Sequence, residues 1–514
     1  MSSLEPTDSS SKIVPEPYQG VFTEPWSLRK LGRVATMFGP AAIVASVAIG
    51  AGETIVVVQA GTWAGYGLLW LVLLSVLVKG VFVTYLLGRY TAVSGEPISQ
   101  RLARLPGPRG WLLITLIVLE MAAAGPLWAA IARPCGDLLH HLLIAGEQAA
   151  ADTAQELAAY KLEAFYERCL TTVFIVAAGL FSLMLTYEKL ERQQVIICGI
   201  LVVGTIIGTL MVRPDFLEVL KGTLSFGKFP ELPDWAPTAA RENIALTLVT
   251  TFGYVGGSVL GYIVYANWIS LHGWGLTSHP QLEAIKRRAG AGRPSDYLPT
   301  DAKMAQRIRD SLVSLKWDVG CGAIVLWVVS ASFMIAGAAV IYPLLETGQI
   351  DGAFSGWSLL TDQAYIWRNV HESLIWVYYV CVLVALWGTL QAFPEIYSRV
   401  IADFASAIWP NHAWCQKRVQ IWSTLFVIAV ASVIIWSDVK FDTLTQVVAF
   451  LTTNLAVALS MVAALYLNFQ LPPAYRTRWW MLTGGVVSAV ILIAVSLISG
   501  VGVWQKLSDA LSSS

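Results

Sequence analysis

Long runs of apolar residues recur along the whole chain and are separated by short polar segments. A run of about 20 apolar residues is long enough to cross the hydrocarbon core of a bilayer as a helix. The pattern predicts eleven such helices, near 36–60, 66–89, 111–133, 169–187, 194–212, 243–270, 318–342, 373–400, 419–437, 443–467 and 480–502. We therefore expect an all-α integral membrane protein whose surroundings are a lipid bilayer.

Composition supports this class and excludes others. Of the 514 residues, 56% are hydrophobic and 13% are charged, whereas soluble domains carry about 25% charged residues. The formal net charge is zero, so the charge balance gives no indication of nucleic-acid or acidic partners, and we expect no nucleic-acid partner. We find no nucleophile–base arrangement and no cofactor motif. The sequence therefore predicts neither an enzyme nor a cofactor.

Basic residues gather in loops on one side of the predicted spans. They are frequent in the tail 1–35 and in the loop 273–316, between the sixth and seventh spans. Cytoplasmic loops carry an excess of Lys and Arg. We expect both segments to be cytoplasmic and, because the span count is odd, the tail 503–514 to lie outside. The inner or plasma membrane of a cell is the expected location, with a monomer favoured.

A glycine-rich interruption lies inside the first span. Gly50, Ala51 and Gly52 precede the acidic residue Glu53. Glycine weakens a helix, and freed backbone groups in a membrane are tolerated only inside protein or along a cavity. A carboxylate at mid-membrane costs about 2.5–3.5 kcal/mol on insertion scales. The combination predicts a substrate or ion site. The alternative is a glycine packing contact beside an acid neutralised by a lysine.

A second interruption lies inside the sixth span. Gly256, Gly257 and Ser258 are the residues that we expect at this break. The alternative is helix packing, because Gly253, Gly257 and Gly261 recur every four residues. The two interruptions lie five spans apart in opposite orientation, as an inverted repeat requires. The prediction is a first repeat over 36–215, a second over 240–468 and one further span over 479–502.

Two other charged residues lie deep within predicted spans. Lys79 and Glu120 fall at similar depths on consecutive antiparallel spans. An ion pair between them is the favoured interpretation, because either charge alone would be costly. A proton path, with Glu120 as the acceptor, is the second interpretation. Pairing of Lys79 with Glu53 is the third, and it would argue against a bare cation as substrate.

Several short motifs resemble those of a known family. Gly39-Pro40, the first interruption and Gly65-Tyr-Gly-Leu-Leu-Trp70 resemble the opening of the Nramp divalent-metal transporters. The resemblance continues through Tyr187-Glu-Lys-Leu-Glu191 and Thr445-Gln446-Val-Val, and it covers roughly residues 30–500. It implies a LeuT-like fold with eleven transmembrane helices. It also implies that Gln446 belongs to a metal site.

The chain departs from the family at the metal motifs themselves. The family's Asp-Pro-Gly-Asn motif corresponds here to Gly50 through Glu53, so the only acid stands at the asparagine place. Its Met-Pro-His motif falls near Leu260–Ile263, which offers neither sulfur nor imidazole. The resemblance therefore implies a divergent member with a hard oxygen site formed by Glu53, Gln446 and backbone carbonyls.

Three functions remain open at this point. The first is an Nramp-related secondary transporter that moves a divalent cation, Mn²⁺, Mg²⁺ or similar, by alternating access, with proton symport as an option. The second is a LeuT-fold transporter of a small organic solute such as an amino acid or amine. The third is a membrane receptor or scaffold that transports nothing. Function has to be decided from the site rather than from the fold.

Overall fold

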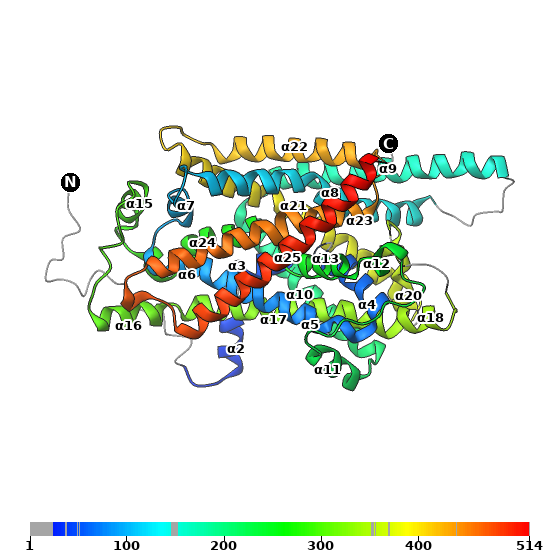
Figure 1. Ribbon diagram of the computed structural model, residues 1–514, viewed down its shortest axis with the longest axis horizontal. Coiled ribbons are helices and arrows are strands. Elements are labelled where there is room, and N and C mark those ends of the chain that lie inside the picture. Colours follow the sequence, from blue (N-terminus) through cyan, green and yellow to red (C-terminus); the bar gives the residue numbers. More distant parts are fainter. Residues whose placement is uncertain are drawn as a thin grey trace.

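The computed structural model describes residues 24–35, 39–48, 50, 52–144, 153–350, 354, 356–368, 371–437 and 439–512. Within these ranges all regular structure is helical and no strand occurs (Figure 1). The α labels mark α-helices and the η labels mark 3₁₀ or π turns. This confirms the all-α prediction.

The elements of the first half include several short helices and turns before the long helices begin. In chain order they are α2 (Leu28–Ala35), α3 (Pro40–Ala48), η2 (Gly52–Val57), α4 (Val58–Ala64), η3 (Gly65–Leu68), α5 (Leu69–Ser75), η4 (Val76–Val83), α6 (Thr84–Ser94), α7 (Ile98–Leu102), α8 (Trp111–Leu143), α9 (Thr153–Met184), α10 (Tyr187–Val212), α11 (Phe216–Leu224) and α12 (Thr238–Glu242).

The second half of the chain also combines short helices and turns with long helices. Its elements are α13 (Ile244–Tyr254), α14 (Val259–His272), η5 (Gly275–Ser278), α15 (Leu282–Gly290), α16 (Ala302–Ser311), α17 (Val313–Ala336), η6 (Gly337–Ile341), α18 (Tyr342–Glu346), α19 (Leu359–Asp362), α20 (Ala364–Arg368), α21 (Ser373–Ile408), α22 (Gln416–Ile435), α23 (Phe441–Val448), η7 (Ala449–Leu455), α24 (Ala456–Gln470), η8 (Pro473–Tyr475) and α25 (Trp479–Ser512).

Ten helical stretches within the described residues are long and apolar enough to cross a membrane. One of them, Gly52–Ser94, has 43 residues. At 1.5 Å per residue it measures about 65 Å, roughly twice the hydrocarbon thickness. Gly65 turns the chain within it, at a φ of 56°. This stretch therefore holds the end of the first predicted span and all of the second.

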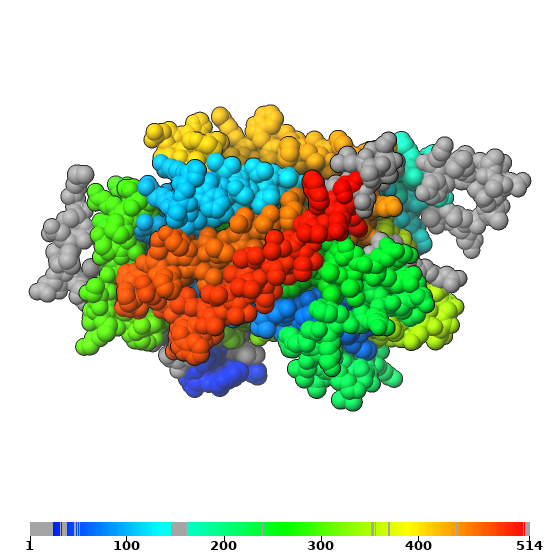
Figure 2. Space-filling view, viewed as in Figure 1, coloured from blue at the N-terminus to red at the C-terminus, as the bar shows by residue number. Residues whose placement is uncertain are grey.

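The long helices run side by side along one direction of the molecule, and α25 crosses them obliquely (Figure 1). This last helix packs on α24, η7 and α13, and its outer side forms much of the face seen in Figure 2. The short helices α7, α15 and α16 lie at one end of the bundle, and α11, α12 and α20 lie toward the other. The predicted cytoplasmic loop is therefore at the end with α15 and α16.

Helix α14 lies at the centre of the bundle. Tyr262, Tyr265 and Trp268 on this helix are fully buried, and it packs against α3, α6 and α21. A helix that is apolar on all sides is buried on all sides. This central position makes the break before α14 an interior feature.

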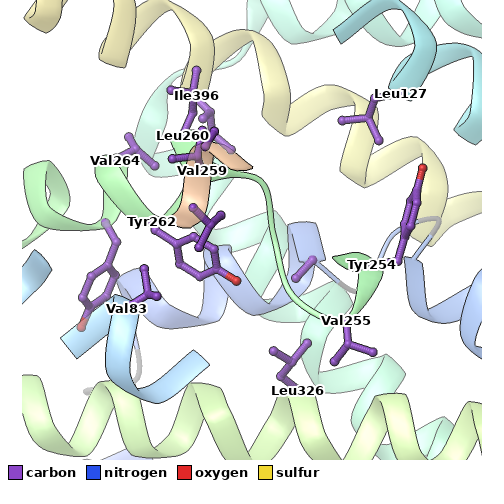
Figure 3. Close-up of a cluster of buried hydrophobic side chains, with 14 of the residues drawn as sticks. Val83, Leu127, Tyr254, Val255, Val259, Leu260, Tyr262, Val264, Leu326 and Ile396 are labelled. Carbon is purple, nitrogen blue, oxygen red and sulfur yellow. The ribbon is translucent and has the colours of Figure 1, made fainter. Parts of the chain in front are cut away.

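Both predicted helix breaks are present. In the sixth span α13 ends at Tyr254 and α14 begins at Val259, and Figure 3 shows the non-helical chain between Val255 and Val259. Gly256 has a φ of 100°, a conformation that side chains other than glycine rarely adopt. In the first span α3 ends at Ala48 and η2 begins at Gly52.

Candidate functional site

The two helix breaks touch each other. A methyl group built on Gly52 would lie 2.4 Å from the Tyr254 carbonyl oxygen, so only glycine allows the two backbones to approach this closely. The Gly256 N–H donates a hydrogen bond of 3.2 Å to Oε1 of Glu53. The first break thus supplies a carboxylate to the second.

Glu53 is fully buried at this contact. Its Oε1 atom also accepts a hydrogen bond of 3.4 Å from the Ser330 hydroxyl on α17. Its Oε2 atom has no hydrogen-bond partner among the described residues. Buried polar atoms almost always have a partner, so an open carboxylate oxygen marks a position where a ligand can bind.

Lys79 closes the end of helix α13. Its ammonium group, also fully buried, donates hydrogen bonds of 2.7 Å to the carbonyl oxygens of Phe252 and Gly253. The Ser75 hydroxyl donates to the carbonyls of Phe252 and Val255 at 2.8 Å each. A helix end leaves its last carbonyls free and carries partial negative charge. The charge of Lys79 therefore compensates the partial negative charge at this broken helix end, and its N–H groups satisfy two of the carbonyls there.

The favoured ion pair between Lys79 and Glu120 is not formed. Glu120, on α8, accepts a hydrogen bond from the Thr452 hydroxyl on η7, and its Oε1 atom has no partner within the described residues. Equal depth on neighbouring spans did not place the two side chains on facing sides of their helices. Ser258 lies close to the Glu120 carboxyl.

The pairing of Lys79 with Glu53 takes an indirect form. The two groups attract each other electrostatically, and Gly256 lies between them, because a methyl group there would be 3.4 Å from Cε of Lys79. The Tyr262 hydroxyl faces the same glycine, at 2.6 Å from that methyl position. A tyrosine hydroxyl, a carboxylate and an ammonium group thus surround one backbone turn.

The remaining predicted site residues lie at different distances from this centre. The Gly50 carbonyl accepts hydrogen bonds from the Thr54 N–H and hydroxyl groups at 3.2 and 2.7 Å, so it is already occupied. Ala51 lies outside the described residues. Gly257 and Gln446 line two separate small cavities. Gln446 is therefore not assembled with Glu53 in this conformation.

Those two cavities lie on opposite sides of the contact between the breaks. The one lined by Gly257 and Tyr262 lies among α3, η4 and α17 and measures about 20 Å³. The one lined by Gln59 and Gln446 lies among α4, α13 and α23 and measures about 40 Å³. A cavity needs about 10–15 Å³ to hold one water. Each space is therefore large enough for one or a few waters, and Glu53 lines neither of them.

The glycine-packing alternative applies to only part of the sixth span. A methyl group on Gly253 would lie 2.8 Å from the Thr453 hydroxyl, so Gly253 does pack against η7. One on Gly257 would reach only Ala48, at 4.0 Å, and one on Gly261 would meet nothing within 4 Å. The fourfold spacing is therefore not a continuous packing face.

Three side chains that organise the region were not among the predicted site residues, and Asp318 was expected at the membrane interface rather than in the interior. Ser330 and Ser75 contact the breaks, as described above. Asp318, fully buried on α17, accepts hydrogen bonds of 3.0 Å from the N–H groups of Gly39 and Ala41 and from the Tyr265 hydroxyl. Asp318 thereby satisfies free N–H groups at the start of α3. Serines in spans are too common to be singled out, and the partner of Asp318 is 279 residues away.

Three of the π turns carry the buried polar groups of this region. Glu53 lies on η2, Lys79 on η4 and Thr452 on η7. Such turns are rare and occur often at functional sites, because they shift a side chain out of the regular helical register. Within the described residues no cluster of three or more His, Cys, Asp or Glu side chains occurs. A cation at Glu53 would therefore meet one carboxylate and otherwise neutral oxygens.

Broken first and sixth spans that meet around one buried carboxylate, in an all-helical bundle, define the LeuT-like class of membrane proteins. A family model described as natural resistance-associated macrophage protein-like (Nramp) matches residues 41–502. The chain therefore belongs to the Nramp-like family.

Solved structures share the fold of this chain. The manganese transporter of Eremococcus coleocola in complex with an aromatic bis-isothiourea compound is 15% identical, with a TM-score of 0.60 over 93% of this chain and 88% of that one. A histidine-to-alanine variant of the same transporter is 14% identical, with a TM-score of 0.62 over the same shares. No curated protein matches the chain.

Proposed function

We propose that the protein is an Nramp-related secondary transporter that moves a divalent cation across the membrane, with Glu53 as the binding carboxylate. The single observation that carries this proposal is the open Oε2 atom of Glu53, fully buried where the two helix breaks meet. Family membership supports the transport class, and a solved relative of the same fold is a manganese transporter.

The predicted ion is a hard one. Glu53 offers carboxylate oxygen, the Ser330 hydroxyl beside it adds a neutral oxygen, and the Tyr262 hydroxyl faces the neighbouring Gly256. Oxygen ligands suit Mn²⁺, Mg²⁺ and Ca²⁺ better than copper or zinc. One carboxylate leaves a divalent charge half neutralised, so the bound ion keeps part of its water.

Alternating access is the mechanism that the small cavities favour. The cavity beside Gly257 is lined by residues that precede the first break and follow the second, and the cavity beside Gln446 by residues that follow the first break and precede the second. Widening one while the other stays closed would open Glu53 to a single side of the membrane. Gln446 would then join the ion from the second cavity. Glu120, with one free carboxylate oxygen, is the candidate proton carrier.

Transport of an organic solute is the second candidate, and Lys79 is the observation that favours it. Its ammonium charge opposes a bare cation at Glu53 and would attract the carboxylate of an amino acid. The cavities of about 20 and 40 Å³ are too small for such a solute in this conformation. The divalent cation is therefore the better fit.

The experiment is calorimetric titration of Mn²⁺, Mg²⁺ and Ca²⁺ into purified protein, into Glu53→Gln and into the matched control Glu120→Gln. Saturable binding that is lost in Glu53→Gln and kept in Glu120→Gln is the expected result. Absence of binding to the folded wild type would reject the cation. Uptake of labelled amino acids into vesicles containing the protein would then test the second candidate.

The proposal includes an orientation. The N-terminal tail and the loop 273–316 face the cytoplasm, and the tail 503–514 lies outside the cell membrane. The repeats extend over 36–215 and 240–468, with 479–502 as an added span, and the working unit is a monomer. Labelling of single cysteines in the loop 273–316 and after residue 503, in intact cells, tests the orientation. Labelling of both from the same side would contradict it.

A further inference from the structure

A basic cavity of about 570 Å³ lies outside the site already described, where α16, the start of α17 and the start of α25 meet. Figure 1 shows α16 and the start of α25 close together at the end of the bundle that carries α15. Five cations and one acid line this cavity. They are Arg89, Arg309, Lys316, Arg476 and Arg478, and Asp310.

Ion pairs do not neutralise these cations in the described part of the chain. Arg89 donates to Asn468 Oδ1 at 2.9 Å and to the Tyr475 carbonyl, and both acceptors are uncharged. The Asp310 carboxylate accepts from the amide of Gln306. The cavity thus holds an excess of four positive charges that repel one another.

Lys316 and Arg478 are the two cations most available to a ligand. Both side chains are exposed, and neither makes a hydrogen bond or ion pair to a described residue. Each lies close enough to the other for mutual repulsion. An anion bound between these cations would reduce their mutual repulsion.

The other wall of the cavity is apolar. Val81, Val319, Trp480 and Met481 lie beside the charged groups, and Tyr85 adds a second aromatic ring. Tryptophan and tyrosine concentrate at the interface between membrane and water. An amphipathic cavity at this depth matches an amphipathic ligand, which has a charged head and a hydrocarbon body. A free inorganic anion would leave the apolar wall unused.

We propose that this cavity binds the phosphate head group of an anionic phospholipid, with Lys316 and Arg478 as the direct contacts. Basic cavities between helices on the cytoplasmic side bind such head groups in other membrane proteins. The site is independent of Glu53 and of the identity of the transported substrate. A bound lipid would tie α16, α17 and α25 together.

The test is native mass spectrometry of the full-length protein in detergent with phosphatidylglycerol or phosphatidylcholine. The variant is Lys316→Gln with Arg478→Gln. The matched control is Lys189→Gln with Lys303→Gln, which removes the same charge from exposed positions outside the cavity. A cation near anionic lipid contributes about 1 kcal/mol. Two cations predict a loss of roughly thirtyfold in phosphatidylglycerol affinity, with the control unchanged.

Each outcome decides the proposal. The proposal is supported if the wild type and the control each retain one phosphatidylglycerol and the variant loses it. Equal retention of phosphatidylcholine, or equal loss in variant and control, overturns it. Displacement of the lipid by millimolar inorganic phosphate would identify a soluble anion site and would also overturn it. Because Lys316 and Arg478 bind no other residue of the described chain, the variant should unfold at the wild-type temperature, and this is measured in parallel.

Discussion

Replacement of Gly52 by alanine tests the contact between the two breaks most directly. The added methyl group would lie 2.4 Å from the Tyr254 carbonyl oxygen and 3.2 Å from its carbonyl carbon. These are backbone atoms, which cannot rotate away as a side chain would. The breaks must therefore separate, and the hydrogen bond from Gly256 to Glu53 must lengthen from 3.2 Å.

Two opposing effects set the size of the change. Overpacking of an interior costs about 1–3 kcal/mol. Alanine in place of a helical glycine raises the free energy of unfolding by about 0.5–1 kcal/mol. The net expectation is a loss of about 1–2 kcal/mol in the free energy of unfolding. If the cation-bound state carries this much more strain than the empty folded state, cation affinity at Glu53 falls by roughly five- to thirtyfold.

The assay is unfolding in mixed detergent micelles together with cation titration. Gly261→Ala is the matched control, because its methyl group would meet nothing within 4 Å and should leave stability equal or higher by up to about 1 kcal/mol. If Gly52→Ala matches the wild type in both stability and binding, the close contact between the breaks is refuted. If both variants lose stability equally, glycine content rather than the contact is responsible.

Three further predictions concern the buried polar groups. Lys79→Met removes the cap of a helix end, so the free energy of unfolding falls by about 1–3 kcal/mol, while titration should show tighter cation binding because a repelling charge is gone. Asp318→Asn leaves one backbone N–H without an acceptor and lowers the free energy of unfolding by about 1–3 kcal/mol. Hydrogen exchange in α3 should be faster as well. Unchanged exchange would contradict the role assigned to Asp318. Thr452→Val removes the donor to Glu120 and costs about 1–3 kcal/mol, whereas Thr453→Val, whose hydroxyl bonds within its own helix, should unfold close to the wild type.

Features with a local signature could be predicted from the sequence. Apolar runs of bilayer length identified the spans, and glycine beside an acid identified the break at Gly52 and Glu53. Each of these signals lies within one continuous stretch of the sequence. The break at Gly256 was equally local, since only glycine holds its positive φ without strain.

Features that depend on pairing between distant segments could not be predicted. Lys79 binds two backbone carbonyls, and a carbonyl has no sequence signature because every residue carries one. Depth along a span suggested Glu120 as its partner, but depth does not fix the direction in which a side chain points around the helix. The π turns η4 and η7 change that direction further.

Asp318 has a consequence for how the protein can move. Through three hydrogen bonds it joins the start of α3 to α17 and to Tyr265 on α14. These hydrogen bonds thus connect α3 and α14, one half of each broken helix, to α17 on the same side of the breaks. If α3, α14 and α17 move as one unit, a path from Glu53 toward that side opens by displacement of the neighbouring helices. The broken helices would then not need to bend individually. Asp318 would in that case lie in the stationary group of helices, next to its boundary with the helices that move.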